Sequence, residues 1–129
     1  MRIIISIISG LAVGGLLVGL IQTFAFNMYP EAGTLVKNYD ASPELIPDGF
    51  NWFIISSHII GCLAGGFITS LINKKKRFTI GMSVALVILG FTVYYNFSQN
   101  FPDWARIADI ILTAIGGALG SLLGSRGRR

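Results

Sequence analysis

The chain has 129 residues, of which 53% are hydrophobic and only 12% are charged, and its mean hydropathy is +0.69. An average soluble domain has about 25% charged residues, so this sequence lacks the charged surface that would cover a soluble core. The composition excludes an ordinary soluble domain, a disordered chain and a free nucleic-acid-binding protein, although the formal net charge is +4.

Four long apolar runs predict four transmembrane helices. They cover Ile3–Phe26, Phe53–Ile72, Phe78–Phe97 and Ala105–Gly124. Each run has about 20 residues or more, enough to cross a hydrocarbon core of about 30 Å as an α-helix. Their apolar residues are continuous, which argues against the alternating pattern of a membrane β-barrel. The sequence therefore predicts an all-α membrane protein with one domain over residues 1–129, an up-down bundle of four helices.

The segment at residues 27–51 is far longer than the usual connection of about 4–6 residues. Pro30-Glu31 and Ser42-Pro43-Glu44 are typical helix starts, so we expect one or two short helices there. Leu35, Val36 and Tyr39 would then lie either on the bilayer surface or in a lid over the end of the bundle.

The charged residues predict the orientation of the bundle. Basic residues concentrate at the start of the first run, between the second and third runs and after the fourth: Arg2, Lys74, Lys75, Lys76, Arg77, Arg126, Arg128 and Arg129. All six acidic residues lie at or near the other side. Because basic loops stay cytoplasmic, we expect both termini inside and the 27–51 loop outside, in the inner (plasma) membrane of a bacterium. Of these eight basic residues, all but Arg2 serve as topology anchors or contact anionic lipid headgroups.

An internal match suggests a tandem duplication of a helical hairpin. The second and fourth runs align with an offset of 51, which places Gly65-Gly66 on Gly116-Gly117 and His58 on Asp109. The first and third runs align with an offset of 71, which places Gly10 on Gly81.

Glycines at four-residue spacing predict close helix packing, because glycine lets two backbones approach each other. The glycines of these stripes are Gly10, Gly14, Gly15, Gly19, Gly61, Gly65, Gly116, Gly120 and Gly124. On the second and fourth runs the same stripes include the ionisable residues His58 and Asp109.

Four polar side chains lie at a similar depth, one on each apolar run. These are Gln22, His58, Tyr94 and Asp109, and their spacing from the glycines predicts a small polar cavity in the outer third of the bundle. One interpretation is a proton-sensitive pair of His58 and Asp109, because ionisable groups inside a membrane are costly and are candidates for function. The other is that these groups only hydrogen-bond the helices together, or that Asp109 pairs with Arg106 one turn earlier.

The sequence contains no phosphate loop, dinucleotide fingerprint or paired-carboxylate motif. Ser57 and His58 are adjacent, so on a helix they point about 100° apart and cannot form a nucleophile–base pair. A metal site of His58, Cys62 and Asp109 would lack any ligand-spacing motif. We therefore expect no catalytic residues, no metal and no cofactor.

Three features resemble an uncharacterised family of small four-helix bacterial membrane proteins. They are Tyr29-Pro30, the pattern His58-x-x-Gly61-x-x-x-Gly65-Gly66, and Phe101-Pro102-x-Trp104 leading into Asp109. The family often has a proline inside the fourth helix; this sequence has none there, which would leave that helix straighter. The resemblance implies the architecture and carries no activity.

The first functional hypothesis is a non-enzymatic inner-membrane protein that packs in the lipid bilayer as a homo-oligomer or as an accessory component of a larger membrane complex, with no nucleic-acid partner. The alternative is a small proton-linked transporter or channel built around the polar cavity.

Overall fold

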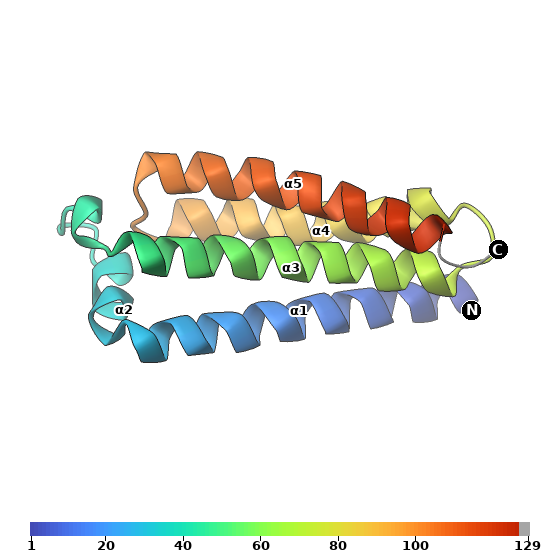
Figure 1. The fold of residues 1–129 in the computed structure, drawn as a ribbon, viewed down its shortest axis with the longest axis horizontal. Coiled ribbons are helices and arrows are strands. Elements are labelled where there is room, and N and C mark those ends of the chain that lie inside the picture. Colours follow the sequence, from blue (N-terminus) through green and yellow to red (C-terminus); the bar gives the residue numbers. More distant parts are fainter. Residues whose placement is uncertain (127–129) are drawn as a thin grey trace.

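A computed structural model describes residues 1–126 and is all-helical over that range (Figure 1). Four helices are each long and apolar enough to cross a membrane: α1 (Arg2–Met28), α3 (Asp48–Ile72), α4 (Arg77–Ser98) and α5 (Asp103–Arg126). They run alternately up and down, and the start of α1 and the end of α5 lie at the same end of the bundle (Figure 1). The prediction of an all-α, four-helix membrane fold is confirmed.

The two short helices lie in the long connection between α1 and α3. The helix α2 (Pro30–Lys37) begins at Pro30, and the 3-10 helix η1 (Pro43–Leu45) begins at Pro43. A proline fits the first turn of a helix because its missing N–H would have no partner there. Both helix starts expected from the sequence are confirmed.

This connection folds back as a lid. Val36 of α2 is fully buried in an apolar cluster with Ala25, Phe50 and Phe101. The Asn100 side chain donates to the carbonyl oxygens of Leu35, Asn38 and Ala41, at 3.3, 2.9 and 3.0 Å, which ties the α4–α5 turn to the end of α2. Val36 therefore lies in a lid and not on the bilayer surface. We call this end of the bundle the α2 end and the opposite one the terminal end.

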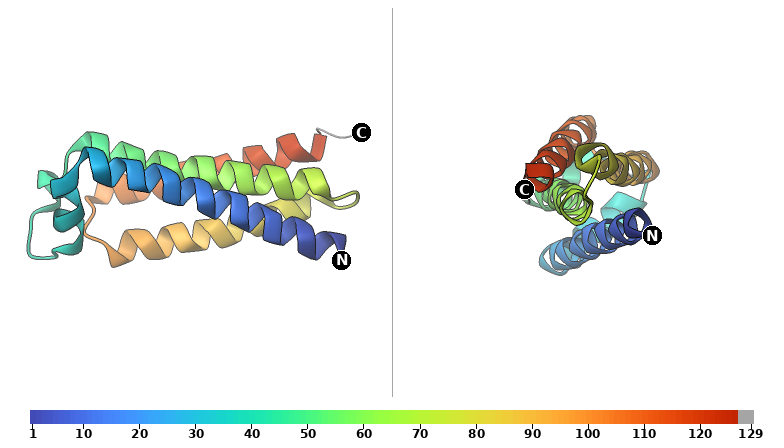
Figure 2. Two further views of the ribbon diagram at one scale, coloured as in Figure 1. Left: turned by 90° about the horizontal axis from the view of Figure 1, so that it is seen from below. Right: turned by 90° about the vertical axis from the view of Figure 1, so that its right-hand side faces the viewer.

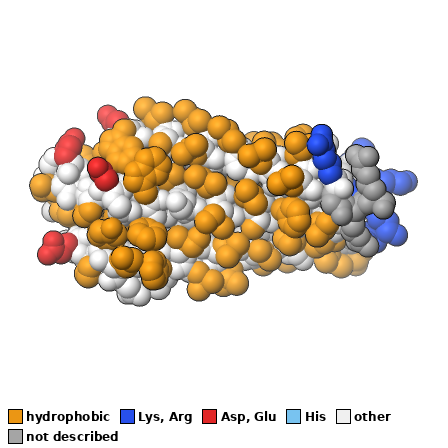
Figure 3. All heavy atoms as spheres, viewed as in Figure 1, with side chains coloured by type: hydrophobic (Ala, Val, Ile, Leu, Met, Phe, Trp, Pro, Cys, Tyr) orange, Lys and Arg blue, Asp and Glu red, His pale blue; other side chains and the backbone are white. Residues whose placement is uncertain are grey.

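The helix α3 is the centre of the bundle and contacts each of the other three long helices, whereas α1 contacts α4 only slightly (Figure 2). Correspondingly, α3 is the most buried of the four and α1 is the least buried. Hydrophobic side chains cover much of the middle of the face shown in Figure 3, with acidic side chains at the α2 end and Lys and Arg side chains at the other. This distribution matches a bundle whose middle contacts lipid.

Glycine contacts hold α3 against its neighbours. A methyl group added to Gly14 of α1 would approach the Gly61 carbonyl oxygen to 2.7 Å, and one added to Gly65 would approach the Gly10 oxygen to 3.0 Å. On the other side of α3, methyl groups added to Gly116, Gly120 and Gly124 would meet the backbone of Ile59, Leu63 and Phe67. These seven glycines of the predicted stripes therefore lie at close helix contacts.

Gly15 and Gly19 differ from the other predicted packing glycines. Nothing lies within 4 Å of a methyl group added at either position, and both residues are exposed. The prediction that they pack against another helix is wrong within the described chain. Four-residue spacing occurs on two neighbouring faces of α1, and only the face with Gly10 and Gly14 meets α3.

Arginine side chains cap helix carbonyls at the terminal end. Arg2 donates to the Ile72 oxygen at 2.7 Å, and Arg77 donates to the oxygens of Asn73 at 2.7 Å and Ser125 at 3.2 Å. Such bonds satisfy the carbonyls that a helix leaves free at its C-terminus. Lys74, Lys75, Lys76 and Arg126 are exposed at the same end, whereas Arg128 and Arg129 lie outside the described residues.

Candidate functional site

The two ionisable residues that the sequence placed inside the bundle contact each other. His58 of α3 and Asp109 of α5 are 4% and 1% exposed, and His58 Nδ1 lies 2.7 Å from Asp109 Oδ2. An ionised carboxylate can only accept a hydrogen bond, so the Nδ1–H of the imidazole donates to it. The bond joins α3 to α5 in the α2 half of the bundle.

Asp109 accepts two further hydrogen bonds from buried groups. Asn96 Nδ2 of α4 donates to Oδ2 at 2.7 Å, and Thr113 Oγ1, one turn along α5, donates to Oδ1 at 3.0 Å. Both donors are at most 2% exposed. Three donors therefore replace the water that the carboxylate loses on burial, as a buried charge requires.

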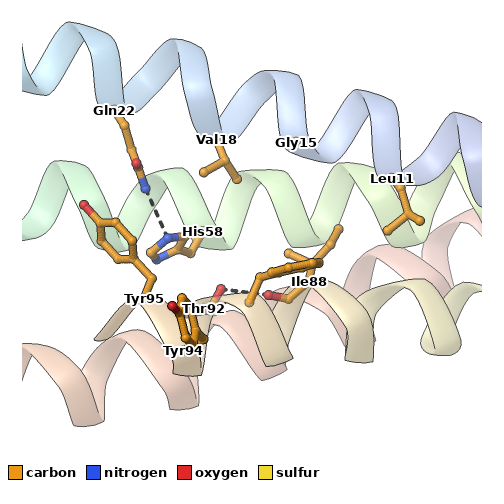
Figure 4. A pocket seen from close by; sticks show the side chains of 10 residues that line it. Leu11, Gly15, Val18, Gln22, His58, Ile88, Thr92, Tyr94 and Tyr95 are labelled. Carbon is orange, nitrogen blue, oxygen red and sulfur yellow. Dashed lines mark hydrogen bonds between the residues drawn. The ribbon is translucent and has the colours of Figure 1, made fainter. Parts of the chain in front are cut away.

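The second ring nitrogen of His58 faces α1. Gln22 Nε2 lies 3.1 Å from His58 Nε2 (Figure 4). The same nitrogen lies 3.3 Å from Ser57 Oγ. With Nδ1 protonated, the neutral ring has its lone pair on Nε2, which accepts from the Gln22 amide. Gln22, His58, Asn96 and Asp109 thus form one hydrogen-bonded chain across all four long helices.

The tyrosine that contacts His58 is Tyr95 and not Tyr94. The Tyr95 ring packs edge-on against the imidazole with centroids 5.4 Å apart. Tyr94 is 73% exposed and lies apart from Gln22 and His58 in Figure 4. Consecutive residues of a helix point about 100° apart, so Tyr95 packs against the imidazole while Tyr94 lies on the exposed side of α4.

Sequence reasoning missed Asn96, although a signal for it was present. Val84, Ile88, Thr92 and Asn96 form the buried face of α4 at four-residue spacing. The predicted Tyr94 lies four residues from Gly90, on a different face of α4, and Gly90 has nothing within 4 Å of an added methyl group. Two polar residues four apart in an apolar helix, Thr92 and Asn96, would have indicated the correct face.

Two alternatives raised by the sequence do not form. Arg106 does not pair with Asp109: it donates to Asp103 Oδ1 at 3.3 Å and to the oxygens of Asn96 and Gln99. Cys62, one turn from His58, donates to the Ala85 oxygen at 3.4 Å. Over residues 1–126 no group of three His, Cys, Asp or Glu side chains is placed to hold a metal ion.

A cavity of about 410 Å³ adjoins His58. It lies between α1 and α4, and Leu11, Val18 and Ile88 are among its apolar walls. Gln22, His58 and Tyr95 meet at one end of it, whereas Leu11 lies toward the other end (Figure 4). Phe91 and Tyr94 line the cavity and are 69% and 73% exposed, so it opens on the side of the bundle. One ring nitrogen of His58 therefore bonds a buried carboxylate while the imidazole lines a cavity.

The comparisons with known proteins identify a family without an assigned activity. A search of curated proteins and a search of solved structures gave no match. Residues 44–124 match the family described as "Protein of unknown function (DUF3792)", and this segment includes His58, Asn96 and Asp109. The match confirms the resemblance to an uncharacterised family. Because it covers more than half of the chain, the protein belongs to this family of unknown function.

Proposed function

We propose that the protein is a small, non-enzymatic, proton-linked membrane transporter or channel. The observation that carries this proposal is the position of His58, which bonds Asp109 through Nδ1 and lines the cavity beside Gln22. A proton bound or released at this pair would change the wall of the cavity directly. Ionisable groups within a membrane span are costly to bury, so a pair that contacts a cavity is a functional candidate.

Protonation of His58 would reorganise the Gln22 contact. A second ring proton turns Nε2 from an acceptor into a donor, which then faces the N–H donors of the Gln22 amide. The amide has to rotate its oxygen toward the ring, and its bond to Ser57 Oγ is lost. The other groups that contact His58 are Asp109 of α5 and Tyr95 of α4. Arg106 is held by Asp103 and by the carbonyl oxygens of Asn96 and Gln99.

The contacts also support a non-enzymatic role. Ser57 Oγ donates to the Ile54 oxygen at 2.6 Å and accepts from Gln22, so it does not meet His58 as a nucleophile would meet its base.

The test is pH-dependent flux in proteoliposomes containing a pH-sensitive dye. We expect the wild-type protein to move protons, and His58→Gln and Asp109→Asn to abolish the movement. Thr23→Val is the matched control, because the exposed Thr23 hydroxyl bonds only the Gly19 oxygen of its own helix. Absence of flux together with a pH-independent NMR signal from His58 would reject the proposal.

A second candidate function is that of a packing component, as a homo-oligomer or in a larger membrane complex. The completely bonded Asp109 favours it, since such a network fixes four helices without any need for a solute. The exposed Gly15 and Gly19 on α1 offer a face on which another helix could approach closely. Native mass spectrometry of the protein extracted from its membrane tests it: a defined homo-oligomer or partner complex supports this candidate, and a monomer without a partner rejects it.

The proposed location is a bacterial inner membrane, with the terminal end in the cytoplasm. The exposed basic residues Lys74, Lys75 and Lys76 lie at that end. A fluorescent protein fused to the C-terminus should fluoresce in this orientation, and alkaline phosphatase fused there should be inactive. The reverse pair of results would invert the proposed topology.

A further inference from the structure

The cavity beside His58 has one polar end and long apolar walls. Along α1 it extends from Leu11 to Gln22, roughly 16 Å at 1.5 Å per residue. Its polar groups gather at the Gln22 end, and its volume of about 410 Å³ lies in the usual range for small-molecule sites, about 300–1,000 Å³. The shape suits a molecule with a small polar head and one apolar chain.

Two polar atoms at this end have no hydrogen-bond partner among residues 1–126. They are the Tyr95 hydroxyl and Gln22 Oε1, since the recorded bonds of Gln22 use only its nitrogen. One is a hydroxyl donor and the other is an acceptor. A head that accepts from Tyr95 and donates to Gln22 would satisfy both, and a carboxylic acid has both functions on its two oxygens.

We propose that the cavity binds a single-chain carboxylic acid in its protonated form, which enters from the bilayer between α1 and α4. This ligand class rests on the proposed function, because it fills the cavity that His58 lines. The acid head lies at Gln22, Tyr95 and His58, and the chain lies along Leu11, Val18 and Ile88.

The charge of the site favours this head over a phospholipid. Asp109 accepts hydrogen bonds from three donors, and its carboxylate would repel a permanently anionic phosphate nearby in a medium of low dielectric. A protonated acid is neutral when it enters. It keeps its proton, which it donates to Gln22 Oε1, so that no second carboxylate forms beside Asp109.

Photolabelling of the purified protein in phospholipid nanodiscs tests the proposal. The probe is dodecanoic acid carrying a diazirine at its methyl end, and the excess phospholipid serves as the competing source of acyl chains. We expect labelled residues on α1 and α4 around Leu11 and Ile88. Unlabelled dodecanoic acid should remove the label, whereas its methyl ester, which has no acid proton, should not.

Two glycines of α1 provide a matched pair of variants. Gly15 lines the cavity and Gly19 does not, and both have open space around an added methyl group, so neither substitution strains the fold. Gly15→Leu should fill the cavity and reduce labelling about tenfold. Labelling of Gly19→Leu should equal that of the wild type. Tyr95→Phe should weaken binding about fivefold, the effect of one lost hydrogen bond.

Competition by the methyl ester equal to that of the acid would overturn the proposal, since the cavity would then accept any acyl chain. Equal labelling of Gly15→Leu and wild type would also overturn it. Proton flux without acid binding would reject this ligand class and leave the proposed function standing. Competable acid binding without flux would support the ligand site and reject transport.

Discussion

At the α2 half of the bundle, side chains from α3, α4 and α5 converge on Asp109. At the terminal half, α3 and α5 touch through glycine. Asp109 accepts from His58, Asn96 and Thr113. At the terminal half, Gly120 and Gly124 of α5 lie directly against the backbone of α3. The first arrangement depends on the protonation of its members, and the second does not.

This difference separates the helix contacts that can respond to a proton from those that stay fixed. Backbones in contact at glycine leave no room for adjustment, so the terminal half is a rigid base. In the α2 half, α1 is joined to the network only through Gln22, and the cavity lies between α1 and α4. Under the proposed function, a proton-driven change would therefore act in the α2 half, while the glycine contacts of the terminal half hold the helices together.

The largest effect is expected for Gly120→Leu at the terminal half. The new side chain would collide with the backbone of Leu63, and α3 and α5 would have to separate. We expect the free energy of unfolding in detergent to fall by about 3 kcal/mol. Gly19→Leu is the control and should change it by less than about 0.5 kcal/mol, because the space around Gly19 is open. Equal losses in the two variants would contradict the rigid-base interpretation.

Asp109→Asn should have the next largest effect, at the α2 half. Oδ2 accepts from both His58 Nδ1 and Asn96 Nδ2, and an amide cannot serve three donors with its one oxygen. We expect a loss of about 2 kcal/mol in unfolding free energy. The same substitution at the exposed Asp103 should cost less than about 0.5 kcal/mol. In Asp109→Asn, amide hydrogen exchange should become faster only in the α2 half. A uniform increase of the exchange rate along the bundle would contradict this prediction.

The sequence sufficed for the fold because its signals are strong and local. Continuous apolar runs place the four helices, and Pro30 and Pro43 begin the two short ones. The sequence could not distinguish Gly14, which meets the Gly61 oxygen, from Gly15, which meets nothing. The two are adjacent, and only the position of the partner helix decides which of them packs.

The candidate site was predictable in part for a similar reason. Gln22, His58 and Asp109 are rare polar groups in apolar helices, so their convergence in the α2 half followed from depth and spacing. To choose between Tyr94 and Tyr95 one has to know how α4 is rotated about its own axis, because the two side chains point about 100° apart. The sequence predicted a small polar cavity at this depth, but its long apolar walls were out of reach, because their shape depends on the slight contact between α1 and α4.

A smaller effect is expected when one donor to Asp109 is removed. Thr113→Val keeps the shape of a buried side chain and deletes the hydroxyl that donates to Oδ1, so we expect a loss of about 1 kcal/mol. Thr23→Val deletes a hydroxyl that bonds its own helix at the surface and should have almost no effect. The difference between the two unfolding free energies measures how much this one bond contributes to the network. No difference would mean that Asp109 does not need its third donor.

The smallest expected effect concerns Glu44, an acidic residue at the α2 end, and it distinguishes this residue from the buried His58–Asp109 pair as the group that responds to protons. Glu44 is fully exposed, and its hydrogen bond from the Ser42 hydroxyl, with help from its own backbone N–H, lowers the pKa of its carboxyl. Removing the hydroxyl in Ser42→Ala should raise that pKa toward its ordinary value, measured by NMR titration of the carboxyl carbon. Ser83→Ala, which removes a surface hydroxyl that bonds its own helix, should leave it unchanged. Glu44 lies outside the long helices, so the pH dependence of proton flux can be compared between wild type and Ser42→Ala. An unchanged dependence would assign the proton-responsive group to the buried pair. A dependence that shifts with the Glu44 pKa would place that group in the lid.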